Sequence, residues 1–147
     1  MDRPLYPFTA VVGQERAKQA LLCLAVEPRI GGVLLCGEKG TAKSTLVRAL
    51  GGLEGVRRLE LPVSATEDML LGGGELEAAV RTGCRTFQPG LLARADGAVL
   101  YADEVNLLPS ALTAALLDTL ETGVCRVERD GISHTCPARF ALVGTMN

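Results

Sequence analysis

The spacing of apolar positions predicts a chain in which strands and helices alternate. Short apolar runs predict strands at residues 32–36, 97–102 and 139–144, and the run at 97–102 is typical of a buried strand. Weak alternation of apolar and polar residues predicts a further short strand at residues 58–62. Apolar residues three and four positions apart predict helices at residues 13–26, 45–50 and 109–123. Pro28 would end the first helix, whereas Pro109 and Gly123 would open and close the last. Strands that alternate with helices indicate an α/β domain with a parallel sheet covered on both faces.

Residues 64–95 depart from this alternation and read as an insertion. Within it, Gly72-Gly73-Gly74 would break the chain. Residues 75–80 would form one or two helical turns, and residues 82–85 a turn.

Residues 124–136 predict a β-hairpin around Asp130-Gly131, a dipeptide that suits a two-residue turn. Such a turn pairs Arg129 with Ile132 and, at the base, Cys125 with Cys136, within reach of a disulfide. We expect these two thiols to be adjacent but unbonded, with no metal beside them. His134 would face Val127 as a surface or packing residue.

Composition limits the classes of function. The 147 residues suffice for one domain, and 48% hydrophobic with 3% aromatic residues predicts an aliphatic core. A net charge of −2 argues against nucleic acid or an anionic membrane as the main partner. The sequence offers no membrane span and no signal peptide at its start, so a cytoplasmic protein is expected. Five cysteines without C-x-x-C spacing make metal or redox sites weak hypotheses, and Cys23 and Cys36 are expected to act as small hydrophobes.

The strongest candidate for chemistry is a glycine-bearing loop between the first apolar strand and the next helix. A strand, such a loop and a helix together indicate a phosphate-binding P-loop. Glycines let backbone N–H groups surround phosphates, the lysine reaches the β- and γ-phosphates, and the serine hydroxyl can ligate Mg²⁺. The predicted nucleotide-binding residues of this loop are Gly37, Glu38, Lys39, Gly40, Thr41, Ala42, Lys43, Ser44 and Thr45.

Ala42 stands where glycine is usual before the lysine of a P-loop. Because alanine carries a Cβ, we expect it here only with a negative φ.

Asp103 and Glu104 end a fully apolar strand and form a second candidate group. In P-loop folds ligands lie at the carboxyl ends of strands, where an aspartate can hold Mg²⁺ and a glutamate can polarise the attacking water. Asn147 follows the last strand and would also lie beside the phosphates. Asn147 can hydrogen-bond the γ-phosphate or the lytic water without adding charge. The pattern thus predicts ATP and Mg²⁺ as cofactors, with Lys43, Glu104 and Asn147 catalytic and with Ser44 and Asp103 near the metal.

In this order, the P-loop, the strand-end Asp-Glu pair, the hairpin and the strand-end asparagine resemble an AAA+ ATPase. More narrowly, the chain resembles the ATPase (I-type) subunit of magnesium chelatase and its cobalt-chelatase relatives. Arg29-Ile-Gly-Gly-Val-Leu34 and Asp103-Glu-Val-Asn-Leu-Leu108 are the most specific phrases. The full resemblance covers Tyr6–Glu15, Pro28–Thr45, Leu61–Asp68, Phe87–Ala93, Leu100–Leu108 and Val143–Asn147.

The resemblance implies a three-layer α-β-α P-loop NTPase (AAA+) core over residues 1–147. It also implies a ring-forming motor, a hexamer in the complete protein. Such a motor hydrolyses ATP and works with a D-type and a large H- or N-type subunit that inserts Mg²⁺ or Co²⁺ into a tetrapyrrole. Val11, Val12 and Gly13 would lie by the adenine. The hairpin would be the family's pre-sensor hairpin, and Thr66–Leu92 would contain its helix-2 insertion.

In this family the chain continues beyond the position of Asn147 into an arginine-finger segment and a helical lid. We therefore expect these 147 residues to be the N-terminal part of an ATPase module, lacking the lid, and to hydrolyse ATP very slowly alone.

Two alternatives remain open from the sequence. A MoxR-like AAA+ chaperone shares Gly-Thr-Ala-Lys-Ser and remodels proteins or inserts metals into them. A structural subunit would bind nucleotide without hydrolysis, although the intact Lys43, Asp103 and Glu104 argue against it.

Overall fold

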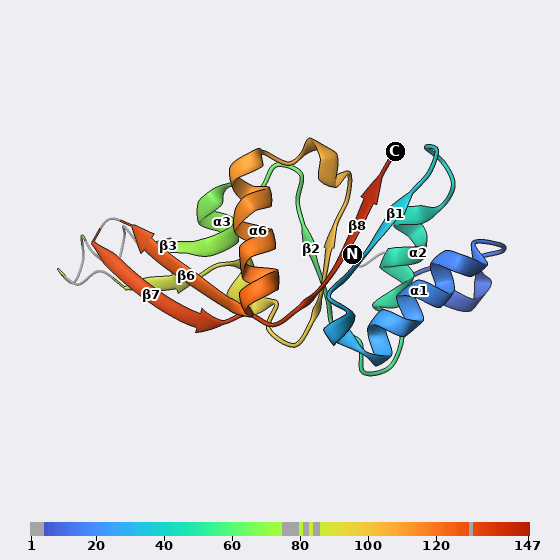
Figure 1. Ribbon diagram of the computed structural model, residues 1–147, viewed down its shortest axis with the longest axis horizontal. Coiled ribbons are helices and arrows are strands. Elements are labelled where there is room, and N and C mark those ends of the chain that lie inside the picture. Colours follow the sequence, from blue (N-terminus) through green and yellow to red (C-terminus); the bar gives the residue numbers. More distant parts are fainter. Residues whose placement is uncertain (1–4, 75–79, 81–82, 84–85, 130) are drawn as a thin grey trace.

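Four parallel strands in the order β1-β8-β5-β2 form the centre of the computed structural model (Figure 1). The structure describes residues 5–74, 80, 83, 86–129 and 131–147. The strands of this sheet are β1 (Gly32–Cys36), β2 (Arg58–Leu61), β5 (Val99–Ala102) and β8 (Ala141–Met146). The parallel sheet predicted from the alternation of elements is therefore confirmed.

Helices cover both faces of this sheet, so the domain has three layers. All four residues of β5 are buried; Val99 and Tyr101 face one core, and Leu100 and Ala102 face the other. The first core is closed by η1 (Phe8–Ala10), α1 (Glu15–Val26) and α2 (Lys43–Leu50). The second is closed by α3 (Glu67–Leu71), α5 (Leu91–Arg94) and α6 (Ser110–Thr122). Two further short helices are η2 (Pro28–Ile30) and η3 (Val105–Leu107). No helix in the described ranges has the length and apolar character needed to cross a membrane.

Most predicted elements are present, with their ends shifted. The helix expected from residue 13 begins at Glu15, because Gly13 and Gln14 have φ of 75° and 59° and so cannot belong to it. α6 fits the prediction: Pro109 precedes it, and Gly123 ends it with φ of 69°.

Cys23 and Cys36 are exposed, so the expectation that they pack as small hydrophobes is wrong. Cys36 lies on β1, an edge strand of the described sheet, and Cys23 lies on the outer side of α1.

The glycine run in the insertion forms a strand rather than a break. β3 (Gly72–Gly74) pairs antiparallel with β4 (Phe87–Pro89). Gly72 has φ of 94°, and a Cβ there would lie 2.3 Å from the carbonyl oxygen of Gln88. The glycine is therefore required by the close approach of two strands, which a sequence reading mistakes for a chain breaker. The turns predicted for residues 75–80 and 82–85 fall largely outside the described residues.

The predicted hairpin is confirmed in its register. β6 (Val124–Arg129) and β7 (Ile132–Pro137) pair Arg129 with Ile132, Val127 with His134 and Cys125 with Cys136. Asp130 lies outside the described residues. Cys125 and Cys136 are both free thiols, as predicted.

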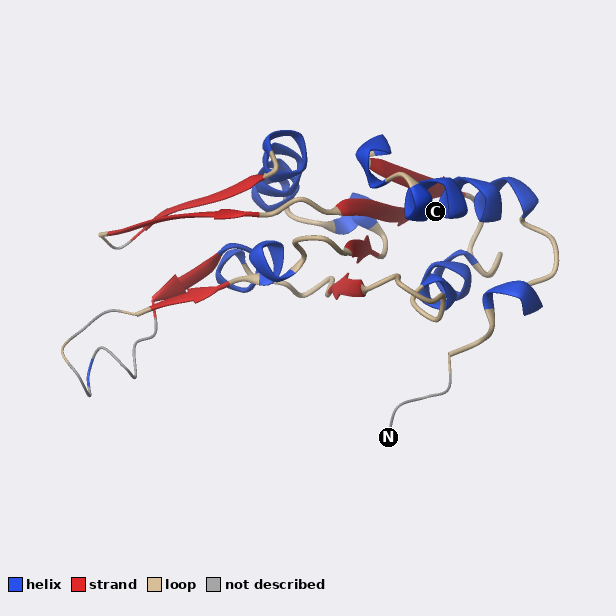
Figure 2. Cartoon of the chain, turned by 90° about the horizontal axis from the view of Figure 1, so that it is seen from below, coloured by secondary structure: helices blue, strands red, loops and turns tan. Residues whose placement is uncertain are grey.

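The hairpin β6–β7 and the pair β3–β4 extend together from the same side of the domain (Figure 2). Arg129 forms ion pairs with Asp68 and Glu67 at the start of α3. The rings of Phe87 and His134 stack with centroids 4.1 Å apart, so His134 has the packing role that was expected. These contacts join two segments that are distant in the sequence into one projection.

The burial of Cys125 predicts selective protection from alkylation. Burial raises the pKa of its thiol to about 11, whereas Cys23 and Cys36 are exposed. At pH 8 we expect iodoacetamide to modify Cys125 about 100-fold more slowly than the two exposed thiols, because the thiolate is the nucleophile. Peptide mass spectrometry over time measures the rates, with urea-unfolded protein as the control. Equal rates would show that the hairpin base is not packed, and a loss of two hydrogens would show a disulfide with Cys136.

Candidate nucleotide-binding site

The P-loop connects the end of β1 to the start of α2, as predicted. Gly37 donates its backbone N–H to the carbonyl oxygen of Met146 on β8, which fixes the loop beside the end of that strand. α2 begins at Lys43, so the free backbone N–H groups of its first turn point toward the loop. Lys43 and Ser44 are the first two residues of this helix. The arrangement makes a compact site for an anion at the carboxyl edge of the sheet.

Ala42 has φ of 59° and ψ of 19°, so the expectation of a negative φ is wrong. Left-handed backbone costs a residue with a Cβ roughly 1 kcal/mol. The loop reverses into α2 at this residue, which precedes the helix and makes no side-chain cap. The reversal requires the left-handed conformation whichever residue occupies the position, and alanine is small enough to adopt it.

Left-handed backbone is concentrated in this part of the molecule. Among the described residues other than glycine, it occurs at Gln14, Ala42 and Glu104. Gln14 Nε2 donates to the carbonyl oxygen of Thr41 at 2.8 Å, and Glu104 follows β5 with φ of 49°. Strained backbone of this kind gathers at functional sites, where the surrounding structure holds it.

Lys43 is a buried cation without an acidic partner. The residue is 9% exposed, and Nζ lies 2.7 and 2.6 Å from the carbonyl oxygens of Gly37 and Glu38. It also contacts Thr41 Oγ1 and Asn147 Oδ1, each at 3.2 Å. All four partners are neutral, and within the described residues no carboxylate lies within ion-pair distance of this ammonium group. A buried positive charge balanced only by dipoles favours an anionic ligand.

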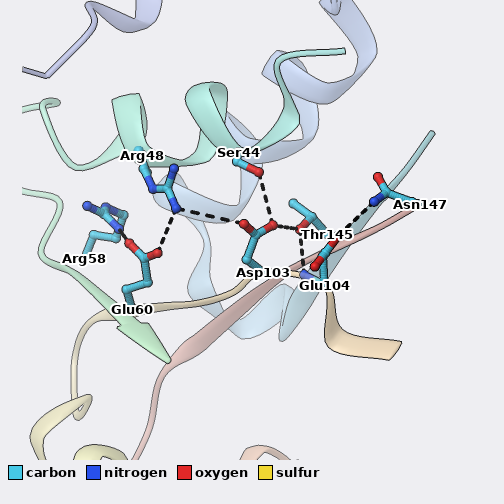
Figure 3. Close-up of polar contacts among 8 residues, drawn as sticks. All are labelled: Ser44, Arg48, Arg58, Glu60, Asp103, Glu104, Thr145 and Asn147. Carbon is cyan, nitrogen blue, oxygen red and sulfur yellow. Dashed lines mark hydrogen bonds and ion pairs between the residues drawn. The ribbon is translucent and has the colours of Figure 1, made fainter. Parts of the chain in front are cut away.

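Asp103 is held by hydroxyl groups from two other elements (Figure 3). Ser44 Oγ donates to Asp103 Oδ1 at 3.1 Å, and Thr145 Oγ1 donates to the same oxygen. Burial disfavours the charged carboxylate, but the hydrogen bonds from Thr145 and Ser44 and the charge of Arg48 outweigh it and lower the pKa of Asp103. The carboxylate therefore stays ionised beside the hydroxyl of Ser44, as an Mg²⁺ site requires.

Asn147 bridges the lysine and the glutamate. Its Oδ1 accepts from Lys43 Nζ. Its Nδ2 donates to Glu104 Oε1 at 3.0 Å (Figure 3). This bond orients one carboxylate oxygen of Glu104. Because Glu104 is only half-buried, its carboxylate remains accessible. The structure thus brings together the lysine, the acidic pair and the asparagine that the sequence singled out.

The remaining predicted residues lie around this group with different exposures. Val11 is buried, whereas Val12 is 95% exposed and Gly13 has φ of 75°. The bond from Gln14 to Thr41 places this segment next to the P-loop. Lys39, Gly40 and Thr45 are exposed.

Three residues of the site were missed by the sequence reading: Gln14, Arg48 and Thr145. Thr145 is buried on β8, and it both donates to Asp103 and accepts from the backbone N–H of Glu104 at 3.1 Å. A polar residue at a buried position of an apolar strand was the available signal.

Thr145→Val tests whether this hydroxyl positions the acidic pair. Valine leaves the partly buried N–H of Glu104 without this partner, which costs about 1 kcal/mol, the lower end of the range for a buried unpaired donor. We expect a lower free energy of unfolding and weaker Mg²⁺-dependent nucleotide binding, measured by urea unfolding and by titration calorimetry. Thr113→Val is the control, because the Thr113 hydroxyl donates only to the carbonyl oxygen of Pro109, the residue before α6, and lies outside the site. Equal nucleotide binding in the two variants would exclude the positioning role.

A family model described as AAA domain (dynein-related subfamily) matches residues 32–147. The chain belongs to this AAA domain family. The match begins with β1 and includes the P-loop, Asp103, Glu104 and Asn147. The fold predicted by resemblance, a P-loop AAA+ core, is confirmed.

Relatives narrow the similarity to chelatase subunits. The magnesium-chelatase subunit ChlI of Cyanophora paradoxa is 41% identical over 186 aligned positions, which cover 99% of this chain and 54% of that protein. A ChlI homologue of Methanocaldococcus jannaschii is also 41% identical, covering 97% of this chain and 49% of that protein. An uncharacterized protein of Mycobacterium tuberculosis is 54% identical over 149 positions, covering 97% and 24%.

The AAA domain chain is shorter than these relatives in two respects. It spans about half the length of the ChlI proteins, 54% and 49%. Their alignments run over 186 and 180 positions against 147 residues here, so both contain internal residues without a counterpart in this chain. The mycobacterial alignment, over 149 positions, is nearly collinear with it.

A solved structure agrees. A chain from a cryo-EM-based model of the complex between the magnesium-chelatase subunits BchI and BchD superposes with a TM-score of 0.80 at 42% identity. The superposition covers 99% of this chain and 56% of that one. The resemblance to I-type magnesium-chelatase subunits is therefore confirmed for the region that the chain spans.

Proposed function

We propose that this domain binds ATP with Mg²⁺ and hydrolyses it. The observation that carries the proposal is the buried ammonium group of Lys43, which faces only neutral partners at the start of α2. A triphosphate would supply the missing negative charge. Backbone N–H groups of the P-loop would hold the phosphates, and the segment Val11–Gly13 would lie by the adenine.

The residues beside Lys43 fit a magnesium ion bound with the nucleotide. Ser44 supplies a hydroxyl oxygen and Asp103 an ionised carboxylate, the oxygen ligands that Mg²⁺ prefers. When bound, the ion would neutralise charge on the phosphates and hold them in place. Asp103 would act directly or through the water shell of the ion.

Glu104 and Asn147 fit the handling of the attacking water. A Glu104 carboxylate oxygen would accept a hydrogen bond from the water and draw its proton, while Asn147 holds the other oxygen in place. Asn147 also contacts Lys43, so it would sense the lysine's engagement with the γ-phosphate.

We further propose that the protein is the ATPase motor subunit of a metal chelatase. The support is 41% identity to ChlI proteins over nearly the whole chain and the superposition on a BchI–BchD complex. In this proposal it forms a homo-oligomeric ring, a hexamer in the complete protein. It would act with a D-type and a large H- or N-type subunit, and its ATP hydrolysis would drive insertion of Mg²⁺ or Co²⁺ into a tetrapyrrole. That the 147 residues alone turn over slowly stays a prediction, as does a cytoplasmic location.

Reconstitution tests the proposal. The complete protein is mixed with the D-type and large subunits of the same organism, ATP, a tetrapyrrole, and Mg²⁺ with or without Co²⁺. We expect metal insertion, followed by absorbance, only when this subunit and ATP are both present. Insertion that proceeds equally without this subunit would refute the chelatase role, and absence of ATP binding by calorimetry would refute the nucleotide site itself.

A further inference from the structure

Arg48 connects Asp103 to a second carboxylate on the neighbouring strand (Figure 3). Arg48 lies on α2, one turn after Ser44, and its Nη2 is 3.0 Å from Glu60 Oε1 and 3.9 Å from Asp103 Oδ2. The same guanidinium nitrogen thus contacts two carboxylates and lies closer to Glu60, which has no assigned role in nucleotide binding, than to Asp103.

Both sides of this contact are constrained. Glu60, on β2, forms a second ion pair through Oε2, which lies 2.9 Å from Arg58 Nη1. The guanidinium carbon of Arg48 lies 5.8 Å from the ring centroid of Tyr101, close enough for a cation–π contact. These contacts hold the guanidinium group of Arg48 closer to Glu60 than to Asp103. Asp103 meets it only with Oδ2, because Oδ1 is engaged by Ser44 and Thr145.

We propose that Glu60 diverts Arg48 from Asp103 and so keeps this carboxylate available for a divalent cation, which makes both residues positioning residues of the nucleotide site. This inference rests on the proposed function, because it assumes that Asp103 serves Mg²⁺ bound with ATP. Arg48 and Mg²⁺ are both attracted to Asp103, and Glu60 offers the arginine a nearer partner.

Removing the charge of Glu60 releases Arg48 toward Asp103. The three side chains are partly exposed, at 46% for Arg48, 38% for Glu60 and 29% for Asp103, so solvent screens their interactions. At such a site one competing charge changes metal affinity by about fivefold. Arg48→Met removes the competing charge and keeps most of the aliphatic stem. In that background the loss of Glu60 should therefore have no effect on the metal.

The test compares Glu60→Gln, Arg48→Met and the double variant with the wild type. The probe is N-methylanthraniloyl-ADP, whose fluorescence reports its affinity in EDTA and across a Mg²⁺ titration. For Glu60→Gln we expect the Mg²⁺ concentration that half-maximally tightens binding to rise about fivefold, with unchanged affinity in EDTA. The double variant should match Arg48→Met. Glu121→Gln, the same change at an exposed site on α6, is the matched control.

Three results would overturn the inference: an unchanged Mg²⁺ requirement in Glu60→Gln, the same shift in the Arg48→Met background, or an equal loss of affinity in EDTA. The last would mean that Glu60 only maintains the fold. A wild-type protein that does not bind the probe at all would instead refute the proposed nucleotide site. Wild-type binding that depends on Mg²⁺ with no response to Glu60→Gln would refute this inference alone.

Discussion

Replacing Lys43 with alanine is expected to abolish nucleotide binding. The ammonium group is the buried charge that the P-loop leaves without an acidic partner, and a triphosphate would replace its neutral acceptors with ionised phosphate oxygens. Each such bond contributes about 1.5–3 kcal/mol, so the loss of two takes the affinity beyond the range of calorimetry. Titration of ATP with Mg²⁺ into both proteins measures the effect.

Lys18→Ala is the matched control for this variant. Lys18 lies on α1 and forms an ion pair with the exposed Glu15, which contributes little to stability and lies outside the site. The thermal unfolding temperature of each variant without nucleotide separates a lost site from a lost fold. Equal ATP affinity in Lys43→Ala and the wild type would refute the assignment of the P-loop.

The groups that the sequence placed correctly all depend on one geometric rule. In a parallel sheet the carboxyl ends of the strands meet at one edge, so polar residues that directly follow apolar strands come together there. Gly37 follows β1, Asp103 follows β5 and Asn147 follows β8. These three strands are neighbours in the sheet. The sequence could therefore place the P-loop, the acidic pair and the asparagine at one edge of the sheet, and the neighbouring positions of the three strands bring them into contact.

The features that the sequence did not reveal depend on that order or on the backbone. Arg48 meets Glu60 and Asp103 because β2 lies next to β5, which no local pattern states. The backbone of Ala42 is left-handed because the loop must turn into α2 there, a requirement set by tertiary geometry that overrides the residue's own preference. The glycine run Gly72–Gly74 forms strand β3 because β4 pairs with it and approaches Gly72 closely. In each case the conformation or contact depends on a residue that is distant in the sequence, or tertiary structure overrides the local backbone preference. Local propensity therefore cannot predict these features.

Glu104→Gln is expected to preserve ATP binding and block turnover in the complete protein. Glutamine keeps the size of the side chain and can still accept from Asn147 Nδ2, but it cannot draw a proton from the attacking water. Loss of such a group typically lowers the rate by about 10²–10⁴. Lys43 does not bond to Glu104, so the affinity of the variant for ATP should stay within a factor of about two of the wild-type affinity. The substitution would then change turnover without changing binding.

Glu54→Gln, an identical change at an exposed loop position, controls for the loss of one negative charge. ATP affinity is measured by calorimetry and turnover by phosphate release, with Lys43→Ala reporting any contaminating ATPase. Turnover of Glu104→Gln at the wild-type rate would show that another group activates the water. A parallel loss of affinity and rate would mean that Glu104 holds the nucleotide. Only intact binding with lost turnover supports the separation of roles that the geometry indicates, with Lys43 holding phosphate and Glu104, oriented by Asn147, acting on the water.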